Sequence, residues 1–519
     1  MQINYPAWML RPQQTINQMN KLSRLTRNSL IIAFFFLIDK VIAFVRTGII
    51  SRQYTDEVHL LDTFNAANNL PDVLFALISG GALAMAFIPL LTEYLTTKDR
   101  AAAWDLFSRV ANVGFLVTGS IAILIAVFAQ QLVDAKLGIA PGFGEEQRKL
   151  LAELMRLNLI GTVIFSISGL VMASLQANHH FILPAIAPSM YNVGQIFGAI
   201  FLTPRYGIHG LVYGVIIGAL LHLLVQVPGL FMYGFRWTPS LNLRHTGLIE
   251  ALKLMAPRLL TMGGIQLIFL ARDNLASRLD QVGAVTSLTY GWMIMQVPET
   301  ILGTAIATAM LPALSELASR GDWAGFRSTV ERALRVLISL TLPIAAVMSA
   351  GINPLVRGVF GFDEATSTLI TWTTRAYLMA LTGYTIHEVA VRAFYAHKEP
   401  MFPFYAVLLR IFIFLGIGTV GITFFKEIGA PIIAFAEIAL LIEAIILFGW
   451  LSKRTHIPLE AGSSVLKGLI AAVVGGIITY LVALYLPGGA IITALIGMII
   501  GGLIALAIVW SEAKQLLKL

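Results

Sequence analysis

Long apolar runs separated by short polar segments follow one another along the chain. A helix that crosses a bilayer needs about 20 mostly apolar residues, and by that measure the sequence predicts about fourteen such helices. We therefore expect an all-α polytopic membrane protein. The predicted spans lie near residues 29–51, 62–93, 105–130, 152–175, 184–203, 209–233, 249–278, 285–314, 329–350, 368–394, 402–424, 429–451, 463–486 and 489–510.

Three segments of the first half recur in the second half, in the same order and at an offset of about 220 residues. In the first pair, Pro71 of NLPDVLFALISGGALAMAFIPLLTEY aligns with Pro298 of QVPETILGTAIATAMLPALSEL. Such repeats are common in transporters, which often bind their substrate between the repeated halves. The matching pairs are 69–94 with 296–317, 132–143 with 355–362, and 173–184 with 393–403.

The repeat predicts two six-helix lobes in the same topology, followed by two further helices. The N-lobe would cover 29–235 and the C-lobe 236–455, with a cytoplasmic tail at 1–28. The last two helices and a short tail would occupy 456–519. Most loop Lys and Arg residues fall on the side of the N-terminal tail, so both termini are expected in the cytoplasm.

Composition narrows the class of protein further. Only 12% of the residues are charged and the mean hydropathy is +0.80, whereas a soluble domain carries about 25% charged residues. The net charge of +8 fits the asymmetry of the loops, and no basic run interleaved with aromatics suggests a nucleic acid partner. The chain has no cysteine, which excludes disulfides and thiolate metal sites.

No enzyme signature appears, and no phosphate-binding loop of the Gly-x-x-x-x-Gly-Lys-[Ser/Thr] type indicates ATP hydrolysis. We expect a transporter without a cofactor, driven by the membrane potential or by an ion gradient.

The stretch FLIDKVIAFVR (36–46) places Asp39, Lys40 and Arg46 inside the first apolar run. Asp39 and Arg46 are about two helical turns apart and share one face. An internal set of salt bridges is one interpretation. The other, which we favour, is a water-filled cavity whose cationic wall suits an anionic headgroup.

Further polar residues extend the candidate site. Asp62 and Asn68 lie on a polar stripe of the second span, and Arg272 and Asp273 are adjacent in the seventh. Asp273, Glu388 and Glu437 are candidates for ion coupling, because a carboxylate within a membrane can carry a proton or bind a cation. For each of them an ion pair with a nearby Arg is the alternative.

Several blocks of the sequence resemble the MurJ lipid II flippases of the multidrug/oligosaccharidyl-lipid/polysaccharide exporter superfamily. These include DKVIAFVRTGIISRQY (39–54), ASLQANHHFILPAIAPSMYNVG (173–194) and GTAIATAMLPALSE (303–316), and the resemblance covers most of 30–455. It implies two lobes with two appended helices. It also implies alternating-access export of an undecaprenyl-pyrophosphate-linked peptidoglycan precursor from the inner to the outer leaflet of the bacterial cytoplasmic membrane.

The resemblance also implies how the substrate is held and what surrounds it. The headgroup would enter the central cavity while the lipid tail stays in a groove between helices. The implied partners are lipid II, membrane lipids and the cell-wall synthesis machinery. A flippase for another polyprenyl-linked oligosaccharide, a cation-coupled drug exporter and a non-transporting membrane scaffold are the alternatives.

The chain departs from the family at several charged positions. Arg46 and Asp62 are kept, but Lys40 stands at a family Arg. Two other family Arg positions fall on Phe75 and Met293. We therefore expect fewer positively charged groups and fewer bidentate hydrogen bonds to a bound anion, since Lys binds phosphate as a point charge without the bidentate fork of Arg.

Overall fold

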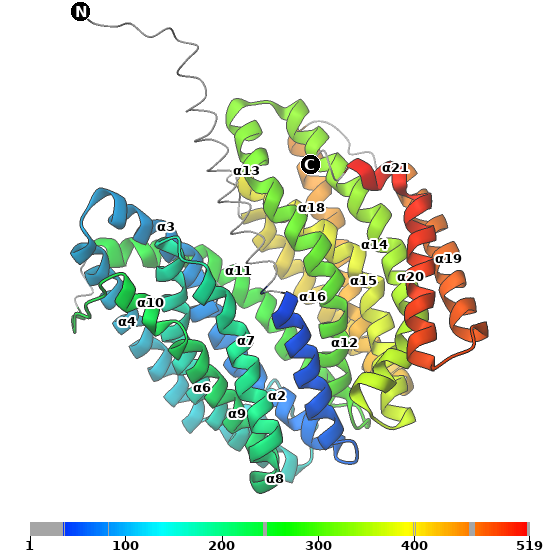
Figure 1. Ribbon diagram of the computed structural model, residues 1–519, viewed down its shortest axis with the longest axis horizontal. Helices are drawn as coiled ribbons and strands as arrows, with labels where there is room; N and C mark the ends of the chain where they lie inside the picture. The colour runs from blue at the N-terminus through cyan, green and yellow to red at the C-terminus, as the bar shows by residue number, and fades with distance from the viewer. Residues whose placement is uncertain are drawn as a thin grey trace, which may run out of the picture. The chain divides into compact units, whose positions relative to one another are not determined.

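The computed structural model describes residues 35, 37–80, 82–241, 246–397, 399, 401–455 and 462–515. Within these ranges the regular structure is entirely helical (Figure 1), as the sequence predicts. A helix over 37–53 comes first. It is followed by α2 (Val58–Leu74), η1 (Phe75–Gly80), α3 (Ala82–Thr97), α4 (Arg100–Val127), α5 (Ala129–Asp134), α6 (Glu145–Ala177), α7 (Ile182–Phe197), η2 (Gly198–Leu202), α8 (Thr203–Tyr206), α9 (Ile208–Leu224), α10 (Val227–Met232), α11 (Thr246–Ser277), α12 (Ala284–Glu299), η3 (Thr300–Thr304), α13 (Ala305–Arg320), α14 (Trp323–Phe360), α15 (Glu364–Ala396), α16 (Met401–Phe424), η4 (Lys426–Ile428), α17 (Ala430–Phe435), η5 (Ala436–Ile438), α18 (Ala439–Thr455), α19 (Gly462–Tyr485), α20 (Ala490–Ile508) and α21 (Trp510–Ala513).

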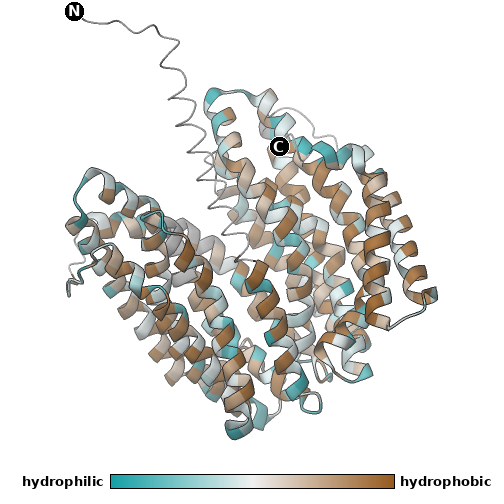
Figure 2. Ribbon diagram, viewed as in Figure 1, coloured by the Kyte–Doolittle hydropathy of each residue, from teal (hydrophilic) through white to brown (hydrophobic). Residues whose placement is uncertain are grey.

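Ten helical segments in the described part of the chain are long and apolar enough to cross a membrane. Each coincides with one of the predicted spans. Of the other four, 29–51 begins outside the described residues, and 62–93 is divided into α2, η1 and α3. The predicted spans 249–278 and 368–394 coincide with α11 and α15. In Figure 2 hydrophobic residues predominate along these helices, for example along α19 and α20. The chain is therefore a polytopic α-helical membrane protein.

The chain divides into two compact units. The first contains residues 1–50, 74–123 and 157–255. The second contains 51–73, 124–156 and 256–519. The lobe boundary between residues 235 and 236 was predicted from the sequence repeat. It stays a prediction.

Wide π-helical turns follow Pro71 and Pro298, the two prolines that align in the repeat. The turn η1 begins at Phe75, four residues after Pro71, and η3 begins at Thr300, two residues after Pro298. Proline within a helix lacks one backbone amide and disturbs regular α-helical bonding, and π-helical turns are rare and occur mostly as single-turn bulges inside α-helices. The two halves therefore share a structural irregularity as well as a sequence pattern.

Glycines hold α7 close against α9 in the first unit. Gly194 and Gly198 of α7 and η2 face Gly218 and Gly214 of α9, and a side chain at any of them would collide with backbone. Small residues of this kind allow membrane helices to pack with little separation. This contact fixes the position of α7, which carries the polar residues described next.

Candidate functional site

An amide from α7 connects two of the three charged residues that the sequence singles out in the first apolar run. The Nη1 atom of Arg46 donates to Oδ1 of Asn192 at 2.8 Å. The Nδ2 atom of the same Asn192 donates to Oδ1 of Asp39, also at 2.8 Å. Asn192 thus satisfies a cation with its oxygen and an anion with its nitrogen, and it keeps both charged groups on one side of the helix over 37–53.

The face of α7 around Asn192 is polar and buried. Ser189, Asn192 and Gln195 recur every three residues, so they lie on one face, and they are 4%, 5% and 6% exposed. Ser189 Oγ, Gln195 Nε2 and Arg46 Nε have no hydrogen-bond partner among the described residues. All three can donate a hydrogen bond. The arrangement can therefore receive an oxygen-rich, negatively charged group.

Sequence reasoning missed Asn192 and its two neighbours on α7. They lie in or next to the family-like block 173–194. The available signal was their three-residue spacing within an apolar span, because buried polar groups normally need a partner. A neutral amide is a weaker signal than a charge in such a span.

Asp62 caps the N-terminus of α12 in the second unit. Its two carboxylate oxygens accept the backbone amides of Gly283 and Thr286, each at 2.7 Å, and its side chain is almost fully buried. The first amides of a helix have no partner within the helix, and a negative charge at that end is stabilising. A structural role for Asp62 follows directly, while its role as a substrate ligand stays a prediction.

Arg272 and Asp273 form a buried pair with a partner from α2. Arg272 Nε donates to Asp273 Oδ1 at 2.8 Å, and the two residues are 5% and 0% exposed. Asn69 Nδ2 also donates to Asp273, whereas Asn68 donates to the Phe64 carbonyl of its own helix at 3.0 Å. The structure therefore brings Arg272 and Asp273 together and places Asn68 outside this pair.

The other two coupling candidates also have cationic neighbours. Glu388 lies 2.9 Å from Arg392 one turn further along α15. Glu437 lies 2.7 Å from Arg410 of α16. No set of three or more His, Cys, Asp or Glu side chains within the described ranges could hold a metal ion.

Phe75, which the resemblance aligns with an Arg of some family members, belongs to an aromatic cluster in the first unit. Its ring meets Phe165 edge-on with 5.0 Å between ring centroids. Phe165 in turn contacts Tyr191 and His222 at 5.0 and 5.1 Å. The position therefore contributes apolar packing instead of a positive charge.

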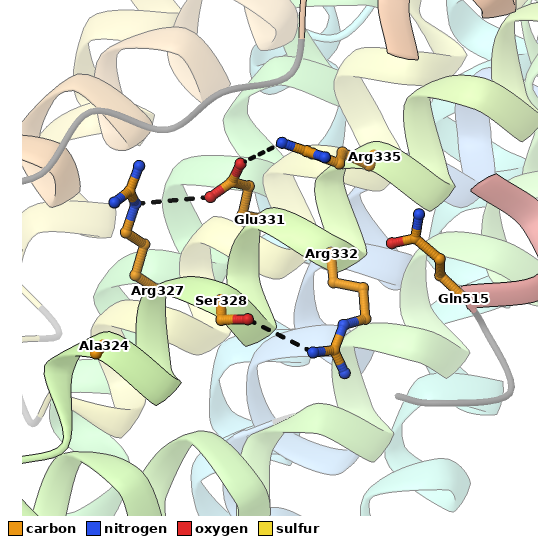
Figure 3. A pocket seen from close by; sticks show the side chains of 7 residues that line it. All are labelled: Ala324, Arg327, Ser328, Glu331, Arg332, Arg335 and Gln515. Atoms are coloured by element: carbon orange, nitrogen blue, oxygen red, sulfur yellow. Dashed lines mark hydrogen bonds and ion pairs between the residues drawn. The ribbon is translucent and has the colours of Figure 1, made fainter. Parts of the chain in front are cut away.

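A separate hollow of about 380 Å³ lies along the first turns of α14 (Figure 3). Glu331 lies between Arg327 at 3.6 Å and Arg335 at 2.6 Å, while Arg332 points the other way toward Ser328. Arginines at this position mark one end of the membrane-spanning part of α14, because basic side chains favour the interface. None of the site residues predicted from the sequence lines this hollow.

Comparison with known proteins identifies the family. The model of the family "Lipid II flippase MurJ" matches residues 58–500. The chain belongs to this family. Membership of a flippase family makes the chain a transporter and not an enzyme, and it confirms the resemblance found in the sequence.

Individual relatives agree with this assignment. The lipid II flippase MurJ of Burkholderia cenocepacia is 28% identical over 386 residues, which cover 72% of this chain and 74% of that protein. The solved structure "Lipid II flippase MurJ, inward closed conformation" matches with a TM-score of 0.78 at 21% identity, covering 94% of this chain and 100% of that one. An inward-facing multidrug resistance MATE family transporter of the MOP superfamily matches with a TM-score of 0.69 at 14% identity, over 80% and 94% of the two chains. The chain therefore shares its fold with this MATE family transporter as well.

Proposed function

We propose that the chain moves lipid II, the undecaprenyl-pyrophosphate-linked peptidoglycan precursor, from the inner to the outer leaflet of the bacterial cytoplasmic membrane. The substrate headgroup would be exposed to one side of the membrane and then to the other by alternating access. The observation that carries the proposal is the match to a lipid II flippase family over 58–500. The half-buried Arg46–Asn192–Asp39 array supplies the matching chemistry.

A pyrophosphate loses its hydration when it enters the protein, and charged donors must replace those hydrogen bonds. Arg46 and Lys40 provide positive charge, and Ser189 and Gln195 provide neutral donors beside them. Asp39 orients Arg46 through Asn192. Neutral donors compensate in part for the apolar residue Phe75 at a family Arg position.

Three further residues are proposed as ligands that act when the cavity opens. Asp62 and Asn68 lie on one helix, α2, and Arg272 is the cation closest in sequence to the coupling candidate Asp273. In the present structure all three are engaged with protein groups. Their contribution would therefore depend on a conformational change that frees them.

Several features of the proposal concern the whole chain. The two six-helix lobes at 29–235 and 236–455 would form the moving halves, and the recurrence of a π-helical turn after Pro71 and Pro298 supports their equivalence. Both termini would face the cytoplasm. The energy would come from the membrane potential or an ion gradient through Asp273, Glu388 or Glu437, and the cell-wall synthesis machinery would be the partner.

Complementation tests the proposal directly. Bacteria whose own lipid II flippase can be switched off should grow when they produce this chain, and precursor should appear in the outer leaflet. Arg46→Ala should abolish this rescue because the anion loses its main cation. Lys149→Ala, which removes an exposed Lys paired only with Glu145 of its own helix, should leave rescue intact. Absence of rescue by the unchanged chain, when it is folded in the membrane, would exclude lipid II as its substrate.

A further inference from the structure

Five polar side chains from neighbouring helices form a buried cluster in the second unit. They are Tyr384 and His387 of α15, Arg410 of α16, Glu437 of η5 and Glu443 of α18, and each is at most 8% exposed. Arg410 Nη2 lies 2.7 Å from Glu437 Oε2, which also accepts the Tyr384 hydroxyl at 2.7 Å. His387 Nε2 lies 3.2 Å from Glu443 Oε1. Both α16 and the segment containing α18 are candidate membrane spans.

The charges of this cluster balance only when it holds one extra proton. Two carboxylates face one guanidinium, so the cluster carries one net negative charge while the imidazole of His387 is neutral. An uncompensated charge is expensive to bury in a membrane protein. One proton on the imidazole makes the cluster neutral and converts the His387–Glu443 contact into an ion pair.

A proton fits this position better than a metal ion does. Glu443 Oε2 is buried without a hydrogen-bond partner in the described chain, but it lies 3.8 Å from Nη1 of Arg410. The guanidinium would repel a metal cation at that oxygen, and a hard cation needs several oxygen ligands at once. An imidazole ordinarily gains or loses its proton between pH 5 and 8 and needs only the carboxylate that already faces it.

The other charged and titratable groups near α15 are already engaged. Glu388 pairs with Arg392 at 2.9 Å. Glu299 of α12 accepts the hydroxyls of Thr300 and Thr304 at 3.3 and 3.0 Å. Arg375 of α15 donates to the Ser349 carbonyl at 2.9 Å, Tyr377 of α15 is buried, and Arg272 and Asp273 of α11 form an ion pair. At the His387–Glu443 contact a proton breaks no ion pair and creates a new one.

We propose that the His387–Glu443 pair is the site at which this transporter binds and releases its coupling proton. The inference rests on the proposed function and names the ion that drives it. It adds His387 and Glu443 to the residues proposed for ion coupling. Glu437 then holds Arg410, while the carboxylate of Glu443 compensates the positive charge of the protonated imidazole.

The position of Arg410 connects proton binding with helix movement. The Arg410 guanidinium faces both carboxylates but lies closer to Glu437, at 2.7 Å, than to Glu443, at 3.8 Å. With the imidazolium present, Glu443 is compensated and Arg410 stays with Glu437. After the proton leaves, Glu443 attracts Arg410, which pulls α16 against α18. Glu437 lies on η5, a short 3-10 segment between α17 and α18, and such interruptions often act as hinges.

Transport in proteoliposomes tests the proposal. Lipid II flipping should accelerate several-fold under an imposed pH gradient, with the membrane potential clamped, and should not respond to a sodium gradient. His387→Gln should abolish the response to the pH gradient. His59→Gln, a change at an exposed histidine of the second unit, should keep it. An equal response in His387→Gln, or a response of the unchanged chain to sodium alone, would overturn the proposal.

A spectroscopic measurement keeps the inference independent of flipping. In full-length protein with labelled histidines in lipid nanodiscs, the His387 resonance, identified by its loss in His387→Gln, should show both the neutral and the protonated imidazole as the pH is varied. In Glu443→Gln the protonated form should be less populated, because no carboxylate faces the imidazolium. A resonance that stays in one protonation state throughout would refute the proton site. If flipping is absent under every gradient while the resonance titrates, the proposed function fails and the proton site stands.

Discussion

The side-chain amide of Asn192 forms hydrogen bonds with both Asp39 and Arg46, two of the three charged residues in the first apolar run. Asn192 is suited to this because its side chain has a donor end and an acceptor end, and here each end meets the charge of matching sign. A carboxylate at this position would repel Asp39, and an apolar side chain would leave both charges without their bridge. The identity of the residue therefore matters more than its volume.

We predict that Asn192→Asp abolishes complementation as completely as Arg46→Ala does. We predict that Asn192→Ala weakens it and lowers the free energy of unfolding by about 1–3 kcal/mol, the usual cost of leaving a buried polar group unpaired. Thermal unfolding and growth rescue measure the two effects. Asn178→Ala, at a residue that bonds only its own helix at 2.9 Å, serves as the control. Full activity of Asn192→Asp would show that the bridge is dispensable.

Asp62 allows a structural role to be separated from a role in binding. Asp62→Ala should lower the free energy of unfolding by about 0.5–2 kcal/mol, as the loss of a helix cap usually does. Asp62→Asn keeps one acceptor for the α12 amides and should recover part of this stability. If Asp62→Asn is stable but inactive in complementation, its negative charge serves transport. If it is stable and active, the residue is only a cap.

Charges within apolar runs could be found from the sequence, but their partners could not. Asp39 and Arg46 stood out because burying them is costly. Asn192 is neutral and lies 146 residues from Arg46, and the amides that Asp62 caps lie more than 220 residues away. No local periodicity encodes contacts at such separations.

At the scale of elements, the ends and contacts of two helices decide where functional side chains lie. Asp363 begins α15, the helix that carries His387, and accepts the amides of Ala365 and Thr366 at 3.2 Å each. Gly194 sets the contact of α7, the helix that carries Asn192. The hydropathy pattern predicted ten of the spans correctly, because an apolar run of about 20 residues usually forms a membrane-spanning helix. The predicted spans 249–278 and 368–394 coincide with α11 and α15, which carry Arg272, Asp273 and His387.

Asp363 should make α15 sensitive to acid. Hydrogen bonds from the Thr366 hydroxyl, and from the amides of Thr366 and Ala365, lower the pKa of Asp363. A lowered pKa gives stabilisation that is complete above the unfolded-state value of about 3.9 and is lost as the pH falls through the folded value. Asp363→Ala should cost about 1 kcal/mol at pH 7. Unfolding measured from pH 7 down to pH 3 should show this difference shrinking, and a constant difference would contradict the assignment.

The close contact of α7 with α9 should be as important as the polar residues themselves. Gly194→Val should displace α7, because its side chain would meet the backbone of Gly218. Both stability and complementation should fall. Gly119→Val is the matched control, since a Cβ there meets nothing within 4 Å. Normal function of Gly194→Val would mean that α7 can shift without disturbing the Asn192 bridge.

At the scale of the whole molecule, the chain combines a repeated sequence with two compact units. The repeat could be found in the sequence because Pro71 and Pro298 align within matching segments, and the two lobes that it predicts stay a prediction. The grouping of 51–73 and 124–156 with the second unit could not be predicted, because it depends on contacts between helices. The orientation in the membrane is a prediction from loop charges alone and can be tested directly.

The absence of cysteine makes an orientation experiment clean, because one introduced thiol is the only reactive one. Leu137, which is 95% exposed, lies in a loop predicted to face outward, and Lys98 lies in a loop predicted to face the cytoplasm. A membrane-impermeant thiol reagent should label Leu137→Cys in intact cells. It should label Lys98→Cys only after the membrane is opened. The reverse pattern would invert the proposed topology.

The π-helical turn after Pro298 also changes the direction in which later side chains point around the helix axis. A wide turn accommodates one residue more than an α-helical turn, and one residue corresponds to about 100° of rotation around the axis. A row of side chains along one face of α12 therefore does not continue in line along α13. Within the second unit, one membrane span thus turns two different faces toward its neighbours, one before the wide turn and one after it.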